Sequence, residues 1–431
     1  MKKISYIIIF SFYFSCLFGQ ETILPALPQS EKIALVNGTI HVGNGSVIEN
    51  GSVVFEKGKI IAVGLNVPTN GMKTIDCKGK HIYPGLILPA TKLGLIEVNS
   101  IRATIDAEEI GDFNPSMRSI VAYNTDSKVI NTLRPNGILL ANVVPDGGTI
   151  SGTSSVVQLD AWNWEDASYK SDVAMVLRMP SLLNSGVRVG QRGQRNDEDR
   201  LAMGLKKVED IKAFFREAKA YLTTEKPSQT NLKFESLRSL FSGKQKLFVH
   251  CSIVKEMLVA IELSKEFGFE ITLVGAEDSW QIADVLKTHN ISVILNSMHS
   301  LPTMIDDDVD QPYKTPAMLQ KAGVLFAIND NDEHNRYRNL PFNAGTACAF
   351  GLAKEEALQA ITLNTAKILG ISDITGSVEI GKHANLVVST GDLLDMRTND
   401  VQAAFIQGRQ VDLANKQTHL NEKYKTKYGI K

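Results

Sequence analysis

Cysteine is scarce in this sequence. The 431 residues include four cysteines, Cys16, Cys77, Cys251 and Cys348, and no two of them form a Cys-x-x-Cys pair. Disulfide-stapled domains and zinc knuckles are built from closely spaced cysteines. The spacing therefore excludes a disulfide framework and a zinc knuckle as the basis of the fold.

An excess of one charge is also missing. Lys and Arg total 46 and Asp and Glu total 47, which leaves a formal net charge of -1 at pH 7. Proteins that are drawn to nucleic acid or an anionic membrane by electrostatic attraction need a basic surplus. We therefore expect no nucleic-acid partner, and a small-molecule substrate or ligand instead.

A hydrophobic run of membrane-spanning length is absent as well. The run from Ile4 to Phe18 follows two lysines and falls short of the roughly 20 apolar residues that a membrane helix needs. A short apolar run after a basic start is typical of a secretory signal. We therefore expect residues 1–20 to be a signal peptide, with no membrane span in the mature chain and export to the periplasm or the extracellular space. In an alternative interpretation Cys16 is the acylated first residue of a lipoprotein, although the Phe-Ser before it fits that processing poorly.

Both ends of the chain carry the pattern of β-strands, and the middle carries a different one. Residues 33–82 and 376–413 alternate apolar and polar side chains with Asn-Gly, Lys-Gly and Gly-Lys breaks, which is typical of hairpins in an antiparallel sheet. Between them, nearly continuous apolar runs such as KLFVH, EITLVG and ISVILN alternate with amphipathic helical stretches. This alternation indicates a parallel sheet covered by helices on both faces.

The length of the middle region favours a closed barrel. It is long enough for eight strand-helix units, which is typical of a (β/α)8 barrel. Only the last four units can be identified in the sequence. The stretch from Arg102 to Lys207 is irregular and Gly-rich, and we expect long loops there.

Four blocks of the sequence resemble the amidohydrolase superfamily, in particular its secreted imidazolonepropionase-like branch. They are NGTIHVGNGSVIENGSVVFEKGKIIAVG, KHIYPGLI, NLPFNAGTACAFGLAKEEALQAITLNTAKILGI and GSVEIGKHANLVV. The resemblance covers almost the whole mature chain. It implies an α/β fold with a TIM-like (β/α)8 barrel over residues 84–375 and a small β-sandwich formed by residues 21–83 and 376–413. Residues 414–431 would then be a C-terminal tail.

The resemblance also implies a ligand set for metal, and this sequence keeps only part of it. Relatives bind one or two divalent metals through a His-x-His after the first strand, a carboxylated Lys on the fourth, histidines after the fifth and sixth, and an Asp that closes the eighth. The metal lowers the pKa of a bound water, and the Asp takes its proton. In this sequence Ala90 and Lys92 occupy the positions of the first two histidines, and Gly275 lies near the sixth-strand position. His250 matches the fifth-strand ligand, and Asp330 matches both the eighth-strand ligand and the catalytic base.

Other candidate residues have an ordinary alternative beside the functional one. His299 could bind substrate together with Lys92 or could be a simple loop histidine. The acidic run Asp306–Asp310 could hold calcium or could be a solvated loop. Arg188–Arg195 could clamp a carboxylate or lie exposed. Trp162 and Trp164 could shape a cleft, but burial of their aromatic area favours a role as loop anchors.

Three functions follow from these residues. The first is a hydrolase of non-peptide C–N bonds, in amides, cyclic imides or small peptide-like substrates, with one divalent metal such as zinc in a degraded or rearranged site. A catalytic zinc needs three protein ligands, and His250 and Asp330 supply two. The second is therefore a metal-free relative, a pseudoenzyme that acts as a small-molecule binding protein or partner subunit. The third is a metal-free enzyme that uses Lys92 as a base or Schiff-base amine. A homo-oligomer and pairing with a related chain both stay open.

Overall fold

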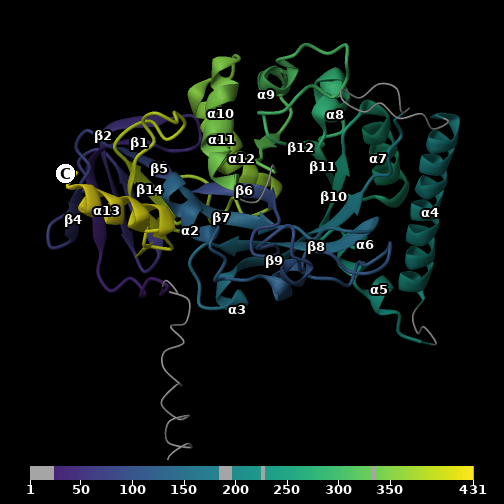
Figure 1. Ribbon diagram of the computed structural model, residues 1–431, viewed down its shortest axis with the longest axis horizontal. Helices are drawn as coiled ribbons and strands as arrows, with labels where there is room; N and C mark the ends of the chain where they lie inside the picture. Colours follow the sequence, from purple (N-terminus) through teal and green to yellow (C-terminus); the bar gives the residue numbers. More distant parts are fainter. Residues whose placement is uncertain (1–23, 184–196, 225–228, 332–335, 431) are drawn as a thin grey trace, which may run out of the picture.

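The computed structural model describes residues 24–183, 197–224, 229–331 and 336–430 (Figure 1). The predicted signal peptide over residues 1–20, the Cys16 acylation site and the loop Arg188–Arg195 lie outside these ranges. None of the helices in these ranges combines the length and the apolar character that a membrane span needs.

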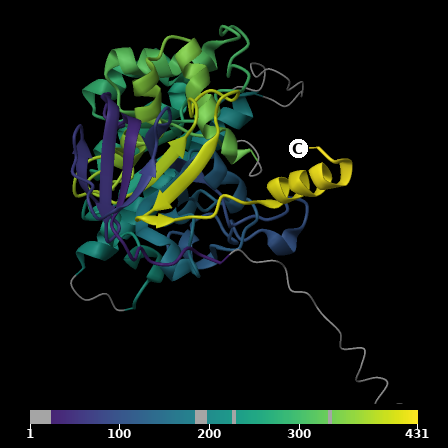
Figure 2. The same ribbon diagram turned by 90° about the vertical axis from the view of Figure 1, so that its left-hand side faces the viewer.

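Both chain ends contribute to one eight-stranded sheet, here called sheet A. Its order is β16-β15-β14-β5-β1-β2-β3, and β4 also pairs with β1. The strands are β1 (Ile33–His41), β2 (Val47–Glu56), β3 (Lys59–Gly64), β4 (Lys73–Asp76), β5 (His81–Pro84), β14 (Leu386–Ser389), β15 (Val401–Ile406) and β16 (Arg409–Gln410). The antiparallel pair β5·β14 joins the two ends, and Figure 2 shows the N-terminal strands beside the C-terminal ones.

Sheet A differs from the predicted antiparallel sheet in one respect. Its hairpins are antiparallel as expected, but β1 pairs in parallel with β4 and with β5. The strands of both ends belong to a single hydrogen-bonded sheet, so the second layer of a sandwich stays a prediction.

The middle of the chain forms a second eight-stranded sheet, sheet B. Its strands follow one another in chain order: β6 (Leu86–Thr91), β7 (Ile138–Val143), β8 (Ile150–Gln158), β9 (Ser168–Arg178), β10 (Lys246–Cys251), β11 (Ile271–Gly275), β12 (Ser292–Leu295) and β13 (Phe326–Ile328). Every one of these strands places a side chain in one buried apolar cluster, among them Ile87, Leu140, Val156, Val176, Phe248, Val274, Ile294 and Ala327. A shared interior of this kind is that of a barrel-like sheet.

Strand β8 departs from the predicted repeat of parallel units. It runs antiparallel to both β7 and β9, whereas β6·β7 and the pairs from β9 to β13 are parallel. Only residues 144–149 separate β7 from β8, and a parallel crossover needs a dozen residues or more. The prediction of long loops from Arg102 to Lys207 is therefore wrong for β7, β8 and β9.

Most helices of this region pack around sheet B, whereas the last of them places Ala366 and Ile368 in the interior apolar cluster. The helices are α2 (Ile130–Leu133), α3 (Trp164–Ala167), α4 (Asp197–Thr223), α5 (Leu232–Glu235), α6 (Arg238–Phe241), α7 (Val254–Phe267), α8 (Ala283–Thr288), α9 (Gln311–Ala322), α10 (Leu340–Ala349), α11 (Lys354–Ala360) and α12 (Leu363–Ile368). Short 3-10 turns complete the set: η1 (Arg102–Thr104), η2 (Ser119–Ala122), η3 (Arg134–Asn136), η4 (Glu277–Ile282) and η5 (Tyr337–Asn339). Figure 1 shows sheet A at one end of the long axis and α4 at the other.

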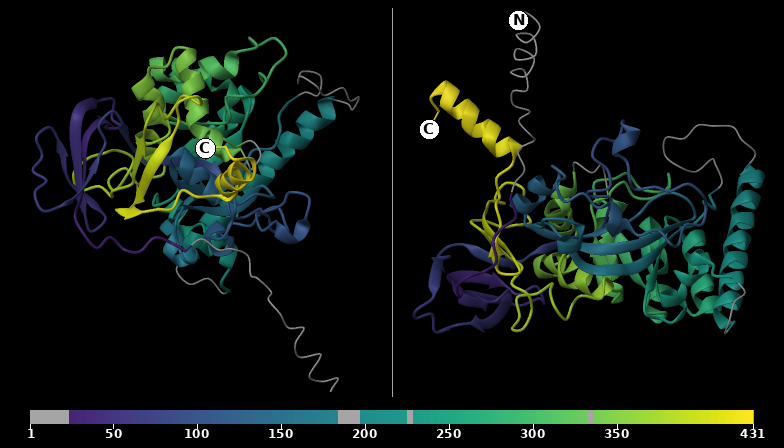
Figure 3. Two further views of the ribbon diagram at one scale, coloured as in Figure 1. Left: turned by 60° about the vertical axis from the view of Figure 1, so that its left-hand side comes forward. Right: turned by 90° about the horizontal axis from the view of Figure 1, so that it is seen from below.

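The predicted tail over residues 414–431 carries a helix. This helix, α13 (Lys416–Tyr428), has no buried residue. Figure 3 shows it projecting away from the body of the molecule. Its N-terminus is capped by Asn415, whose side chain accepts a hydrogen bond from the Thr418 amide.

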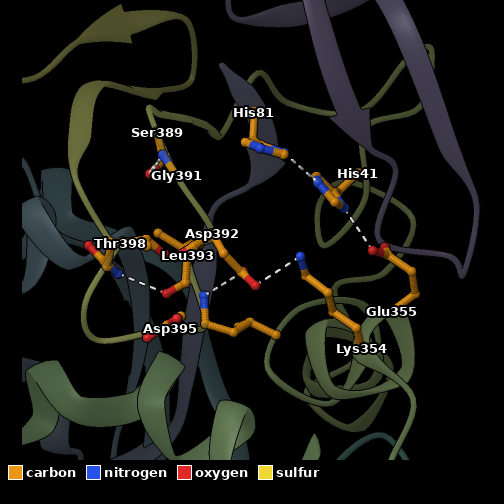
Figure 4. A network of polar contacts seen from close by, with 12 residues as sticks. His41, His81, Lys354, Glu355, Ser389, Gly391, Asp392, Leu393, Asp395 and Thr398 are labelled. Carbon is orange, nitrogen blue, oxygen red and sulfur yellow. Dashed lines mark hydrogen bonds and ion pairs between the residues drawn. The ribbon is translucent and has the colours of Figure 1, made fainter. Parts of the chain in front are cut away.

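A polar network joins sheet A to the helices over sheet B (Figure 4). His41 lies between two partners: its Nδ1 is 2.7 Å from Oε1 of Glu355, and its Nε2 is 3.0 Å from Nδ1 of His81. Beside them, Lys354 pairs with Asp392 at 2.9 Å. Since His41 belongs to β1 and Glu355 to α11, these contacts fix the first strand of sheet A to a helix of the barrel.

Candidate functional site

Two polar side chains, Arg178 and His250, lie at the carboxyl ends of neighbouring strands of sheet B. Val176 and Phe248 belong to the interior cluster, and Arg178 and His250 follow two residues later on the same strands. Side chains two residues apart face the same side of a strand. Arg178 and His250 therefore lie above the apolar interior, at the ends of β9 and β10, where they are direct neighbours in the ladder.

Asp146 holds two cations together at this end of the sheet. Lys92, which follows β6, forms an ion pair with Oδ2 of Asp146, and Nη2 of Arg178 lies 2.5 Å from Oδ1. The Asp146 side chain is 15% exposed, and that of Lys92 is 39% exposed. Burial and the charge of Arg178 lower the pKa of Lys92, while Glu108 opposes that shift. Two cations thus share one partly buried carboxylate, with Glu108 as an exposed acid nearby.

His250 is a neutral imidazole beside this ion cluster. Burial lowers its pKa to about 3, and the positive charges of Arg178 and Lys92 act in the same direction. Its Nε2 is buried and has no hydrogen-bond partner within the described part of the chain. Because the imidazole is uncharged at neutral pH, it can offer either a donor or an acceptor to a ligand.

Several buried polar atoms at this end of sheet B are unsatisfied. They include Nε of Arg178, Oδ1 of Asn142 and Oγ of Ser154, in addition to Nε2 of His250. Asn142 and Ser154 face the same side of their strands as the interior residues Leu140 and Val156. A buried polar group without a partner is costly, so this layer suits a bound polar molecule.

The two predicted metal ligands are both found at the carboxyl ends of strands. Asp330 is 1% exposed and lies just after β13, and its Oδ2 accepts a hydrogen bond from Nδ2 of Asn343 on α10 at 3.2 Å. Among the described residues, no three His, Cys, Asp or Glu side chains are grouped so that they could hold a metal ion.

The sixth-strand position has no room for a ligand side chain. Gly275 has a φ of +90°, and a Cβ there would lie 2.8 Å from the carbonyl oxygen of Cys251. Both the backbone conformation and the contact disfavour any larger residue. The glycine is therefore required by the local fold.

His299, predicted to bind substrate with Lys92, contacts α10. It is exposed, its Nε2 is 2.8 Å from Oγ1 of Thr346 on α10, and it borders a groove formed with Asp392 and Arg397. Neither Lys92 nor His250 lines that groove. The structure thus places Lys92 beside His250, whereas a shared site of Lys92 and His299 stays a prediction.

The contacts bear on two further predictions. The acidic run Asp306–Asp310 is partly neutralised by Lys314, which pairs with Asp308 at 3.0 Å and with Asp310 at 2.7 Å, and this pairing favours the solvated loop over a calcium site. Trp164 packs against the main core as an anchor, but Trp162 is 61% exposed and anchors nothing.

Asp146 and Arg178 were not identified from the sequence. Each follows an apolar run, in ANVVPDGG and VAMVLRMP. A charged residue at the end of such a run indicates a candidate site residue. Their pairing with Lys92 depends on which strands are neighbours. That information came only with the strand order.

Residues 317–411 match the model of the amidohydrolase family. An imidazolonepropionase of Mesorhizobium japonicum is 24% identical over 373 residues, which cover 79% of this chain and 87% of that protein. The amidohydrolase tasK of Hapsidospora irregularis is 20% identical over 390 residues, 82% of this chain and 39% of that protein. An amidohydrolase structure from Thermotoga maritima has a TM-score of 0.76 at 23% identity and covers 88% of this chain and 99% of that one. At this identity the structural likeness concerns the fold.

Proposed function

We propose that this chain binds the carboxylate of a small molecule without a divalent metal. Its matches support the amidohydrolase superfamily, and the proposed site uses the barrel frame of these hydrolases. The observation that carries the proposal is the shared carboxylate of Asp146. It pairs with two cations, Lys92 and Arg178, while the buried Nε of Arg178 has no partner in the described ranges. A ligand carboxylate has two oxygens, which match the fork of N–H donors on a guanidinium.

The side chains at this position do not fit a divalent metal. Ala90 has no lone pair on its side chain, and the charges of Lys92 and Arg178 would repel a dication over a few ångströms. His250 is a single neutral nitrogen donor, whereas a catalytic zinc has three protein ligands. These charges favour the metal-free alternative over the zinc site that the resemblance implies.

Binding of carboxylates and their neutral amides would test this proposal. Acetate, benzoate and N-acetylglycine would be compared with acetamide, benzamide and N-acetylglycinamide by thermal shift and calorimetry. We expect a carboxylate, but not its amide, to bind saturably and to raise the melting temperature. The variants Lys92→Met and Arg178→Met should lose this response.

Two matched variants control for general effects of removing a cation. Lys246 pairs with Glu270 at 2.7 Å at the opposite end of β10, and Arg118 pairs with Asp172 on an exposed surface. Lys246→Met and Arg118→Met should bind carboxylates as the native chain does. Equal responses to acids and amides, or the same loss in the control variants, would reject the carboxylate site.

A second candidate is hydrolysis of a non-peptide C–N bond, in amides, cyclic imides or small peptide-like substrates. It is favoured by the family match and by the burial of Asp330 directly after the last strand of sheet B, where a carboxylate could take a proton from an attacking water. Metal analysis after purification without chelators, together with assays on amides and cyclic imides, separates the two candidates. About one equivalent of zinc, and activity that Asp330→Asn abolishes, would favour hydrolysis.

The Schiff-base alternative is disfavoured by the ion pair of Lys92. Burial lowers the pKa of this amine, but the contact with Asp146 stabilises the ammonium form, which cannot attack a carbonyl. Borohydride reduction with pyruvate should leave Lys92 unlabelled in the mass spectrum. A reduced adduct on this residue would revive the alternative.

We also propose export of the chain through residues 1–20 and assembly as a homo-oligomer or with a related chain. The sequence pattern supports export. N-terminal sequencing of the secreted protein and light scattering of the purified chain test the two points.

A further inference from the structure

A second hollow lies at the same end of sheet B, beside β11 and β12. It opens to solvent and is bordered by η4 and by the segment between β12 and α9. Its walls include the apolar side chains Trp280, Leu295, Met298 and Pro302. Neither Lys92 nor Arg178 lines it, so the inference drawn here does not depend on the carboxylate site.

Acidic side chains line the hollow. Glu277, Asp278 and Asp307 belong to its wall, and the described residues that line it include no Lys, Arg or His. Asp278 is only 4% exposed, and its buried Oδ1 has no hydrogen-bond partner among the residues that the structure describes. Oε2 of Glu277 is also buried without a partner, although Oε1 accepts a hydrogen bond from Asn296 at 2.7 Å.

The negative charge of Asp278 is energetically unfavourable in the folded chain. Burial raises the pKa of Asp278 from 3.8 to about 6, and the charges of Asp307, Glu277 and Glu256 add to the effect. The Val254 amide acts in the opposite direction. A cation placed between these carboxylates would stabilise their charged forms.

We propose that this hollow binds the ammonium end of a small organic amine. The ammonium has three N–H donors for the unpartnered oxygens of Glu277 and Asp278. The ring of Trp280 offers a face to the cation or to its alkyl body, and Met298 and Pro302 cover the remainder. An organic cation fits better than a metal ion, because the walls are largely apolar and no metal-holding group was found among the described residues.

Calorimetry with n-butylammonium chloride tests this site at pH 7.5. We expect saturable binding, no binding of the neutral 1-pentanol, and affinity at least tenfold weaker at pH 4.5, where Asp278 is protonated. Asp278→Asn should weaken butylammonium binding at least tenfold. The matched variant Asp284→Asn removes an exposed acid of α8 outside the hollow and should leave the affinity unchanged.

Tryptophan fluorescence tests whether the ligand lies beside Trp280. Butylammonium should change the emission of the native chain but not that of Trp280→Phe, in which calorimetric binding persists. Removal of the buried charge in Asp278→Asn should leave the fold intact, which circular dichroism checks. The proposal is overturned by equal affinities in Asp278→Asn and Asp284→Asn, by the absence of saturable butylammonium binding, or by calcium chloride that binds where butylammonium does not.

Discussion

Asn329 hydrogen-bonds both main-chain groups of Ala90. Its Nδ2 donates to the Ala90 carbonyl at 2.8 Å, and the Ala90 amide donates to its Oδ1 at 3.4 Å. Ala90 belongs to β6 and Asn329 follows β13. These are the first and last strands of sheet B, and within the described residues they do not pair with each other. A side-chain amide therefore joins the two edges of the barrel-like sheet. It does so at the residue that takes the place of a metal-binding histidine in the resemblance.

Removal of this bridge should destabilise the fold. Asn329→Leu deletes two buried hydrogen bonds and leaves the amide and carbonyl of Ala90 without partners, which we expect to lower the free energy of unfolding by about 2–4 kcal/mol. Urea denaturation measures the change. Asn421→Leu, on the exposed helix α13, should lie within about 0.5 kcal/mol of the native chain. Similar values for the two variants would show that the bridge is energetically neutral.

The carboxylate of Asp146 should matter more than an exposed one in a similar pair. Asp146→Asn leaves Lys92 and Arg178 close together without their shared counter-charge, and the cost of breaking such a partly buried pair is about 2–4 kcal/mol. Asp172→Asn breaks the pair with Arg118, whose side chains are 41% and 43% exposed, and should cost less than about 1 kcal/mol. Denaturant unfolding compares the two. In a double-mutant cycle, Asp146→Asn should cost less in the Lys92→Met background, and strict additivity would contradict the ion cluster.

The sequence predicted most of the architecture that depends on local pattern. Continuous apolar runs located β10, β11 and β12, and alternation at both ends located the strands of sheet A. The position of His250 at a strand end followed from the same runs. The antiparallel course of β8 was not predicted, because the six-residue connection between β7 and β8, with Gly147 and Gly148, has the composition of a loop.

The polar partners of the site could not be predicted in the same way. In the sequence, dozens of residues separate Lys92, Asp146 and Arg178. Their contact depends on the pairing of β6 with β7, on the antiparallel pairs β7·β8 and β8·β9, and on the parallel pairing of β9 with β10. Pattern within one segment gives no information on such register. The sequence did indicate that Lys92 replaces a metal-binding donor, but it did not show which acid would neutralise it.

His250 should make the fold sensitive to acid. Its pKa is about 3 in the folded chain against 6.5 for an ordinary histidine, so below pH 6.5 the unfolded chain binds a proton that the folded chain does not. Stability is therefore complete above pH 6.5 and is lost as the pH falls toward 3. At pH 4.5 this loss is at most about 3 kcal/mol. His250→Gln should flatten the fall in stability between pH 6.5 and 4.5, measured by urea unfolding, whereas His289→Gln, at an exposed site, should not.

Asp278 should act on stability with the opposite sign over an overlapping pH range. Its pKa is raised from 3.8 to about 6, so between these values the folded chain binds a proton that the unfolded chain has released. Stability is therefore highest below pH 3.8, falls as the pH rises to 6, and stays lower above it. Asp278→Asn removes this loss and should raise the free energy of unfolding at pH 7.5 by up to about 3 kcal/mol, with little change at pH 4. Asp284→Asn provides the exposed control at both values. A stabilisation at pH 4 equal to that at pH 7.5 would show that packing, and not the buried charge, distinguishes the variant, and would remove the electrostatic reason for a cation in the hollow.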